Sequence, residues 1–318
     1  MRNRTLAMSG GRLTEQEASS LEKRVEQNPQ DVDARLQLLG FYFRKQVGDS
    51  AAQKTNQEHI VWFIQNEPEF DVLATPFGLL YEKVNAIGYS QGKEAWLDQL
   101  RTDPENLKLL ENSAKYFMLS NSELAEESLL KGRALDSDNP KWPVALGQLY
   151  SLKMKTLSGD EEQSTAEKAL GQLEIAYRLS AKMGQDSLLS ELAKVALVAQ
   201  ETTKAREYAE LMLSKDDSHE NRGNNIHDGN ITLGKIAIAA GDVETAKSSL
   251  INAGKTPGSP PLDSFGPDMA LAKELLKHGE KDAVLEYLRL CSTFWKSGRD
   301  RLVSWIEMIQ NDQTPTDW

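Results

Sequence analysis

Small and apolar residues recur with one spacing in the C-terminal half of the chain. Three stretches begin at Ala193, Gly234 and Ala272, and each has a turn-forming pair seven and eight positions later and apolar residues at +12, +16 and +19. This pattern predicts two short helices joined by a tight turn, with the small residue where the helices touch. One such unit cannot bury its apolar face alone, so we expect neighbouring units to stack.

Prolines extend the pattern toward the N-terminus. Pro29, Pro68, Pro104 and Pro140 each follow an acidic residue or an asparagine, at intervals of 39, 36 and 36 residues. Proline is tolerated in the first turn of a helix and disrupts its interior, so each of these prolines is expected where a new helix begins. An interval near 36 residues accommodates two helices and their turns.

Four regions follow from these signals. Residues 1–12 are rich in Gly, Ser and Arg, and we expect them to form a disordered N-terminal tail. Degenerate helical repeats are expected at 13–102, and a more regular repeat array at 103–298. Residues 299–318 are expected to form a capping helix, which shields the last repeat, followed by a tail.

Single residues refine this picture at both ends. Thr14 and Glu17 have the spacing of a capping box, which predicts the start of the first helix. Cys291 occupies an apolar helical position and is expected to be a small buried residue rather than a nucleophile. Trp318, the last residue, either docks on the end of the array or serves as a partner-binding tail.

The repeating unit combines a small residue, an aromatic or apolar residue, an alanine and a terminal Asp-Pro or Asn-Pro pair. In these features the chain resembles the tetratricopeptide-repeat superfamily, from about Pro29 to Arg299 and best from Pro104 onward. Most units depart from the usual repeat of about 34 residues through longer loops, so no subfamily is identified. The resemblance implies an all-α fold, a right-handed α-solenoid of TPR-like helix-turn-helix repeats with a C-terminal capping helix. It also implies a protein–protein interaction module.

The charge and composition narrow the classes of partner. The formal net charge is −11, which argues against general binding to nucleic acid or anionic membranes and favours a basic protein or peptide. A single cysteine excludes an intrachain disulfide and a cysteine-based metal cage. No stretch approaches the roughly 18 apolar residues of a membrane span, and no apolar run of a secretory signal follows Met1. We therefore expect a cytoplasmic protein.

Two inter-repeat segments, 214–230 and 252–267, are longer than stacking requires. Both connect the second helix of one unit to the first helix of the next, and successive connections of this kind lie on the same edge of a stack. We therefore predict that these two segments are long loops that lie side by side. Long loops on a rigid scaffold often carry function, so this edge is a candidate binding site.

Within the two segments, His227, Asp228 and Asn230 are expected just before a helix start, where free backbone amides can bind an anion. Ser264 and Phe265 lie in the second segment, and Phe265 is a candidate exposed apolar contact. A structural interpretation competes with this one. In it, Asp228 or Asn230 caps the helix, His227 hydrogen-bonds the neighbouring loop, and Phe265 fills the gap between units.

Two aromatic residues suggest a second binding surface. Trp142, between Pro140 and Pro143, and Tyr150, eight residues later, have the spacing of one helical face. They are either core residues or anchors for a peptide or helix in the concave groove of the solenoid.

These observations favour an interaction scaffold that binds a protein or peptide through the groove, the two-loop edge or both. We expect no catalytic residue, metal or cofactor, since no nucleophile or phosphate-binding motif occurs. The alternative is a hydrolase or metal-assisted enzyme at the two-loop edge, with His227 as base or ligand and His219, Asp216, Asp217 and Asp228 as further ligands. Self-association through the groove or the C-terminal residue is a third hypothesis.

Overall fold

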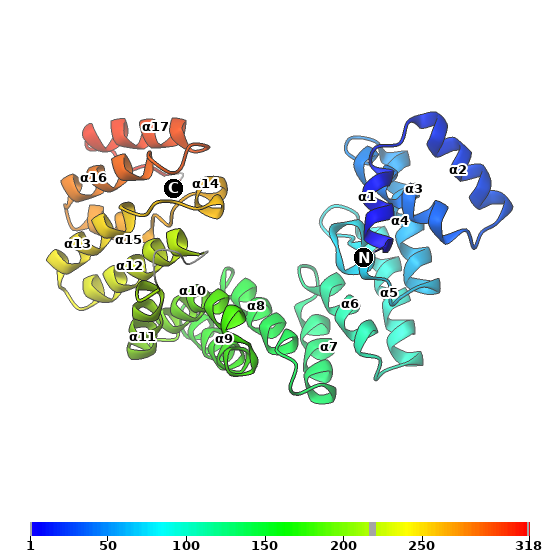
Figure 1. Cartoon of the computed structure of the whole chain (residues 1–318), viewed down its shortest axis with the longest axis horizontal. Helices are drawn as coiled ribbons and strands as arrows, with labels where there is room; N and C mark the ends of the chain where they lie inside the picture. The colour runs from blue at the N-terminus through cyan, green and yellow to red at the C-terminus, as the bar shows by residue number, and fades with distance from the viewer. Residues whose placement is uncertain (1, 216–220, 317) are drawn as a thin grey trace. The chain divides into compact units, whose positions relative to one another are not determined.

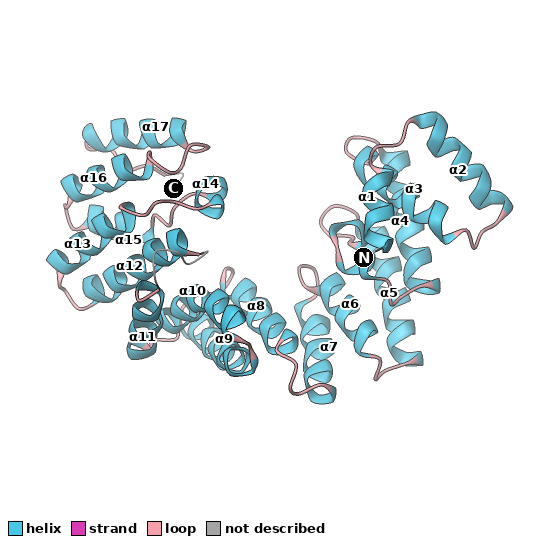
Figure 2. Ribbon diagram, in the orientation of Figure 1, coloured by secondary structure: helices cyan, strands magenta, loops and turns pink. Residues whose placement is uncertain are grey.

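The structure, a computed structural model, describes residues 2–215, 221–316 and 318. Regular structure within these ranges is entirely helical, and no strand is present among them (Figure 2). The prediction of an all-α fold is therefore confirmed. None of the helices in the described ranges has the length and apolar character needed to cross a lipid bilayer.

The chain divides into two compact units, Met1–Leu149 and Tyr150–Trp318, and α8 (Lys141–Met154) contains the boundary between them. The helices of the first unit are α1 (Arg2–Gly10), α2 (Glu15–Gln27), α3 (Val32–Lys45), α4 (Ser50–Asn66), the 3-10 helices η1 (Asp71–Ala74) and η2 (Pro76–Gly78), α5 (Ala86–Thr102), α6 (Leu107–Phe117) and α7 (Ser122–Leu135). Those of the second unit are α9 (Asp160–Leu179), α10 (Lys182–Val198), α11 (Thr202–Leu213), α12 (Arg222–Ala239), α13 (Val243–Gly254), α14 (Pro260–Phe265), α15 (Ala270–Lys277), α16 (Lys281–Cys291) and α17 (Arg299–Gln310).

Helix α1 occupies the region predicted to be a disordered tail, so that prediction is wrong. Its Ala7 and Gly10 are buried against α3. The contact depends on glycine on both sides, because a Cβ atom at Gly40 would lie 1.7 Å from the carbonyl oxygen of Ala7. A helix that docks through glycine and alanine has little apolar side-chain surface, and residues 2–10 accordingly show no apolar stripe in the sequence.

The start of α2 confirms the capping box. The Thr14 hydroxyl accepts a hydrogen bond from the Glu17 amide at 3.3 Å, and the Glu17 carboxylate accepts one from the Thr14 amide at 2.8 Å. Two of the amides that a helix start leaves without partners are thereby satisfied, which fixes where this helix begins.

In the second unit, each helix from α9 to α12 packs on the next helix along the chain, α13 packs on α16, and α16 packs on α17 (Figure 1). The small residues of the repeated spacing lie at these contacts. Ala193 and Ala272 are fully buried, and a Cβ atom at Gly234 would lie 2.2 Å from a terminal methyl of Leu271. The predicted role of small residues at helix contacts is therefore confirmed for these positions. Cys291 is also buried, and burial raises the pKa of its thiol to about 12.

The C-terminal helix covers the end of the second unit. Leu302, Trp305 and Ile309 of α17 are buried in the apolar core that α13, α15 and α16 form. The Trp318 ring lies 5.7 Å from that of Trp305, and its main-chain oxygen accepts a hydrogen bond from Lys273 Nζ at 2.7 Å. Of the two interpretations of Trp318, the structure favours docking on the end of the unit.

The glycine contact between α1 and α3 generates a first prediction. Gly40→Ala adds a methyl group where the Ala7 carbonyl oxygen lies, so α1 has to move away from α3. We expect a loss of about 1–3 kcal/mol in the free energy of unfolding. We also expect faster hydrogen exchange at residues 2–10, measured by mass spectrometry.

Gly171→Ala is the control for this substitution. Gly171 lies inside α9, and apart from the backbone of its own helix and its chain neighbours no atom lies within 4 Å of an added Cβ. There alanine is expected to stabilise the protein by up to about 1 kcal/mol through helix propensity. Unchanged exchange at residues 2–10 in Gly40→Ala would contradict the close packing of α1.

Candidate functional site

The two segments predicted to be long loops are largely helical. Helix α12 already begins at Arg222, so His227, Asp228 and Asn230 lie within it rather than before its start. In the second segment α13 continues to Gly254, and α14 occupies Pro260–Phe265. Residues 216–220 of the first predicted loop, which include three of the proposed metal ligands, Asp216, Asp217 and His219, lie outside the described residues.

Glycines explain why α12 resembles a loop in the sequence. A Cβ atom at Gly223 would lie 1.9 Å from the carbonyl oxygen of Gly258, and one at Gly229 would lie 3.1 Å from the carbonyl oxygen of Ala209. These glycines let neighbouring segments approach the helix closely, although glycine lowers helix propensity. The run of Gly and Asn residues thus reflects packing and does not interrupt the helix.

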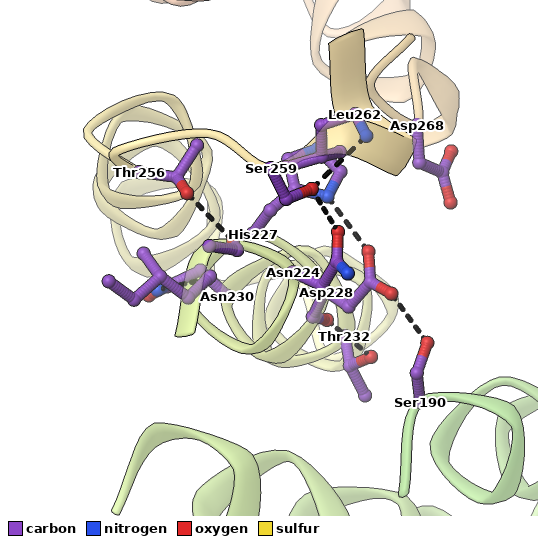
Figure 3. Close-up of polar contacts among 12 residues, drawn as sticks. Ser190, Asn224, His227, Asp228, Asn230, Thr232, Thr256, Ser259, Leu262 and Asp268 are labelled. Atoms are coloured by element: carbon purple, nitrogen blue, oxygen red, sulfur yellow. Dashed lines mark hydrogen bonds and ion pairs between the residues drawn. The ribbon is translucent and has the colours of Figure 1, made fainter. Parts of the chain in front are cut away.

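The two segments do lie side by side, as predicted. The Thr256 hydroxyl donates to the carbonyl oxygen of Gly223 at 2.7 Å, and the Ser259 hydroxyl donates to Asn224 Oδ1 at 2.6 Å (Figure 3). Both hydrogen bonds join the first turn of α12 to the chain between α13 and α14. This prediction is therefore confirmed, although the elements involved are mostly helical.

His227 is fully buried and connects three parts of the second unit. Its Nδ1 lies 2.8 Å from Asp228 Oδ1, and its Nε2 lies 3.1 Å from the Tyr287 hydroxyl of α16. The same hydroxyl donates to the carbonyl oxygen of Asp268 at 3.1 Å. Both ring nitrogens of His227 are therefore occupied, which is the arrangement of a structural histidine.

Asp228 joins α12 to α10. Its Oδ2 accepts a hydrogen bond from the Ser190 hydroxyl at 2.5 Å (Figure 3). The same oxygen lies 3.2 Å from Lys194 Nζ. Burial by itself raises the pKa of Asp228, but the hydrogen bond from His227 and the charge of Lys194 outweigh it and hold that pKa well below its usual range. Asp228 is therefore an ionised carboxylate with both oxygens engaged.

A cavity of about 450 Å³ opens beside this network. It lies within the second unit, between α10, the first turns of α12 and the segment that contains α14. Its polar wall includes Asp186, Ser190, Lys194, Asn225, Asp228 and Asp268, and its apolar wall includes Pro261, Leu262, Phe265 and Pro267. A concave site with apolar walls and a few converging polar groups is typical of a binding site.

Asp268 is the second strongly held carboxylate of the cavity. It pairs with Lys235 Nζ at 3.1 Å and accepts the Ala270 amide at 2.8 Å. Burial raises the pKa of Asp268, but the nearby Lys235 and the amide together lower it below the usual value. The segment between α14 and α15 is thereby attached to α12 through Lys235.

Asn225 is the one polar residue of this wall with an unsatisfied group. Its side chain is buried at 4% exposure, and its Nδ2 is enclosed without an acceptor among the described residues. A buried amide hydrogen without an acceptor costs about 1–3 kcal/mol.

Phe265 is 87% exposed at the end of α14, so it does not fill the gap between units. Gly266, with φ of +86°, ends the helix, and its amide donates to the Leu262 carbonyl oxygen at 3.0 Å. A Cβ atom at Gly266 would lie 2.7 Å from the Trp295 ring, so this turn requires glycine. Ser264 is also exposed on α14.

Three of the predicted site residues do not reach the cavity. Asn230 Nδ2 donates to the Ile226 carbonyl oxygen at 2.8 Å within α12, so Asn230 does not cap the helix. Trp142 and Tyr150 are buried, at 1% and 5% exposure, and are not exposed groove anchors. Trp142 packs against Gly132, where a Cβ atom would lie 2.3 Å from its ring, so it fills the space left by a glycine.

Sequence reasoning missed four residues that build the site: Ser190, Lys194, Asn225 and Tyr287. Ser190 and Lys194 are four residues apart on α10. This spacing places two polar side chains on one helical face, but it does not show which residue they contact.

The sequence matches no protein-family model, and no curated protein shows significant sequence similarity to it. Within residues 2–215, 221–316 and 318, no group of three or more His, Cys, Asp or Glu side chains is arranged to hold a metal ion.

The Asp228 network generates a prediction for pH dependence. Asp228→Asn removes the charge that Lys194 and His227 face, and we expect a loss of about 2–4 kcal/mol in the free energy of unfolding at pH 7. Because the pKa of Asp228 is lowered in the folded protein, its contribution is complete above the unfolded pKa of about 3.9 and is lost as the pH falls below it. The difference between wild type and variant is expected to be about 1 kcal/mol smaller at pH 3.

Urea unfolding of both proteins at pH 7, 5 and 3, followed by circular dichroism, measures this difference. The wild type serves as the reference at each pH, so titration of the other carboxylates cancels to first order. A difference that stays constant from pH 7 to pH 3 would show that the charge of Asp228 does not stabilise the fold.

Proposed function

We propose that the chain is a TPR-like right-handed α-solenoid that acts as an interaction scaffold. Its partner is a protein or peptide that binds at the cavity between α10, α12 and α14. The observation that carries this proposal is the exposure of Phe265 at a cavity that polar groups also line.

The packing order supports the architectural part of the proposal. In the second unit each helix from α9 to α12 packs on the next helix of the chain, as do α15 and α16, and small residues lie at several of the helix contacts. In the first unit α3, α4, α5, α6 and α7 also pack in chain order. Contacts between neighbours in sequence are what stacked helical repeats require.

The exposure of Phe265 supports the binding part. Aromatic residues contribute disproportionately to binding energy in protein interfaces, where they insert into or cover a desolvated pocket. The Gly266 turn fixes the end of α14, so Phe265 is presented from a short ordered helix. An aromatic ring held in the solvent next to a cavity lowers the entropic cost of binding, because little ordering remains to be done.

The hydrogen bonds of Ser190, His227 and Asp228 do not support the hydrolase alternative. Ser190 donates to the carboxylate of Asp228 rather than to His227. A carboxylate with a lowered pKa is a weak base toward a serine hydroxyl, and both nitrogens of His227 already have partners. An interaction scaffold therefore fits the geometry better.

We also propose that the protein is cytoplasmic. The partner can have basic residues in the parts that lie outside the cavity. The single cysteine is buried and unpaired, as is common for proteins of reducing compartments. The net charge of −11 favours the approach of basic partners over acidic ones.

Peptide-display selection tests this function. The wild-type protein selects peptides from a random 12-residue library, and the enriched peptides are titrated by calorimetry against wild type and Phe265→Ser. Loss of an aromatic anchor is expected to weaken binding by about tenfold or more. Val303→Ser is the matched control, since Val303 of α17 is 51% exposed and does not line the cavity.

Two results would oppose the proposal. Enriched peptides that bind Phe265→Ser as tightly as wild type would place the binding surface elsewhere. Light scattering at two protein concentrations separates partner binding from self-association. A dimer that dissociates in Phe265→Ser but not in Val303→Ser would assign this surface to a second copy of the chain.

A further inference from the structure

The first unit contains an apolar cavity that none of the predicted site residues line. It has a volume of about 460 Å³ and lies where α5 and α7 both pack on α6 (Figure 1). Its apolar lining comes from all three helices and from the chain between α5 and α6: Leu97, Leu100, Pro104, Leu110 and Leu124. Leu97, Leu100 and Leu124 are only half-buried, so this α5–α7 groove presents apolar surface to solvent. A groove between helices is a surface on which the apolar face of a further helix can pack.

The charged residues of the groove are available to a partner. Glu94 and Arg101 of α5 and Glu127 and Lys131 of α7 line it, and all four are exposed. Arg101 pairs with the exposed Asp98 of its own helix, whereas the other three form no ion pair with any described residue. The cavity beside α14 differs in this respect, since its carboxylates all have lysine partners.

The four charges are sorted by sign along the groove. The short connections 103–106 and 118–121 make α5 and α7 both antiparallel to α6, so the two helices run in the same direction. On each helix the glutamate comes first. Glu94 precedes Arg101 by about 10 Å along the helix axis, and Glu127 precedes Lys131 by about 6 Å. The groove therefore has an acidic end and a basic end.

From this arrangement we infer that the α5–α7 groove binds an amphipathic helix of a partner protein, with acidic residues in its first turn and basic residues in its last. Apolar residues on one face of this helix cover Leu97, Leu100 and Leu124. Acidic residues stabilise the start of a helix and basic residues its end, because they complement the helix dipole. Such a helix matches both ends of the groove when it runs antiparallel to α5 and α7, as α6 does.

Charge complementarity selects this helix over helices with charges of one sign. A helix with basic residues at both ends would place one end against Arg101 and Lys131, and an acidic helix would place one end against Glu94 and Glu127. The groove thus differs from the chain as a whole, whose net charge of −11 attracts basic partners in general. The inference concerns a second surface and does not depend on Phe265.

Helical peptides of about 18 residues serve as probes, with a hydrocarbon staple that makes them equally helical. Three share one leucine face and differ only in their terminal turns. The dipolar peptide has glutamate in the first turn and lysine in the last, and the other two have lysine or glutamate in both. Fluorescence anisotropy with the whole chain measures their dissociation constants at about 0.15 M salt. We expect the dipolar peptide to bind about fivefold or more tightly than either of the others, because each of those has like charges at one end.

Lys131→Glu reverses the sign of the basic end. We expect the dipolar peptide to bind about fivefold more weakly to this variant, while the peptide with lysine in both turns binds as tightly as before or more tightly. Lys23→Glu is the matched control, since Lys23 is an exposed lysine of α2 that does not line the groove and its substitution changes the net charge equally. Both lysines are exposed, so neither variant is expected to unfold.

Several outcomes would overturn the inference. These are the absence of binding by the dipolar peptide, equal or tighter binding by the lysine peptide, and equal affinity of the dipolar peptide for wild type and Lys131→Glu. A dimer that dissociates in Lys131→Glu but not in Lys23→Glu, seen by light scattering, would assign the groove to a second copy of the chain instead. Phe265→Ser is expected to bind the dipolar peptide as wild type does, so this result and the test of the proposed function are independent.

Discussion

The candidate site depends on one ionised carboxylate. Asp228 is only 14% exposed, and it stays charged because His227, Ser190 and Lys194 all contact it. Taking a carboxylate out of water is costly unless hydrogen bonds and a countercharge replace the lost hydration. Here the replacements come from α10 and α12, and His227 extends the connection to α16. The side chains of the polar wall are thus positioned by interactions that also hold the helices together.

Close backbone contacts complement this polar network. Gly223 lets the chain before α14 approach the first turn of α12, where Thr256 and Ser259 hydrogen-bond to it. The Gly266 turn then ends α14 with Phe265 in solvent. Short segments without a large apolar core of their own are held mainly by such contacts, and here the contacts fix the apolar residues that line the cavity. The cavity therefore exists before any partner binds, which limits the ordering that binding requires.

The sequence predicted those parts of the structure that follow from helical periodicity. Small residues at helix contacts, the burial of Cys291 and the covering role of α17 all come from apolar positions that recur on one face. Features that depend on contacts between residues far apart in the sequence could not be predicted. His227 and Tyr287 are 60 residues apart, and neither local sequence indicates that the two side chains meet. Where packing uses glycine, as in α1 and at the start of α12, the sequence resembles a tail or loop, and the prediction of irregular structure was wrong.

Two departures from ordinary folding rules meet at the same cavity. Buried polar groups are normally satisfied and large aromatic rings are normally at least partly covered, yet Asn225 lacks an acceptor and Phe265 is exposed. The neighbouring charges follow the rules closely, since each carboxylate of the cavity wall has a lysine partner. A general looseness of packing would leave the charges unmatched as well. The exposed ring therefore belongs to a cavity whose charges are matched within the chain, and sites that break local rules in an otherwise consistent structure are where function is expected.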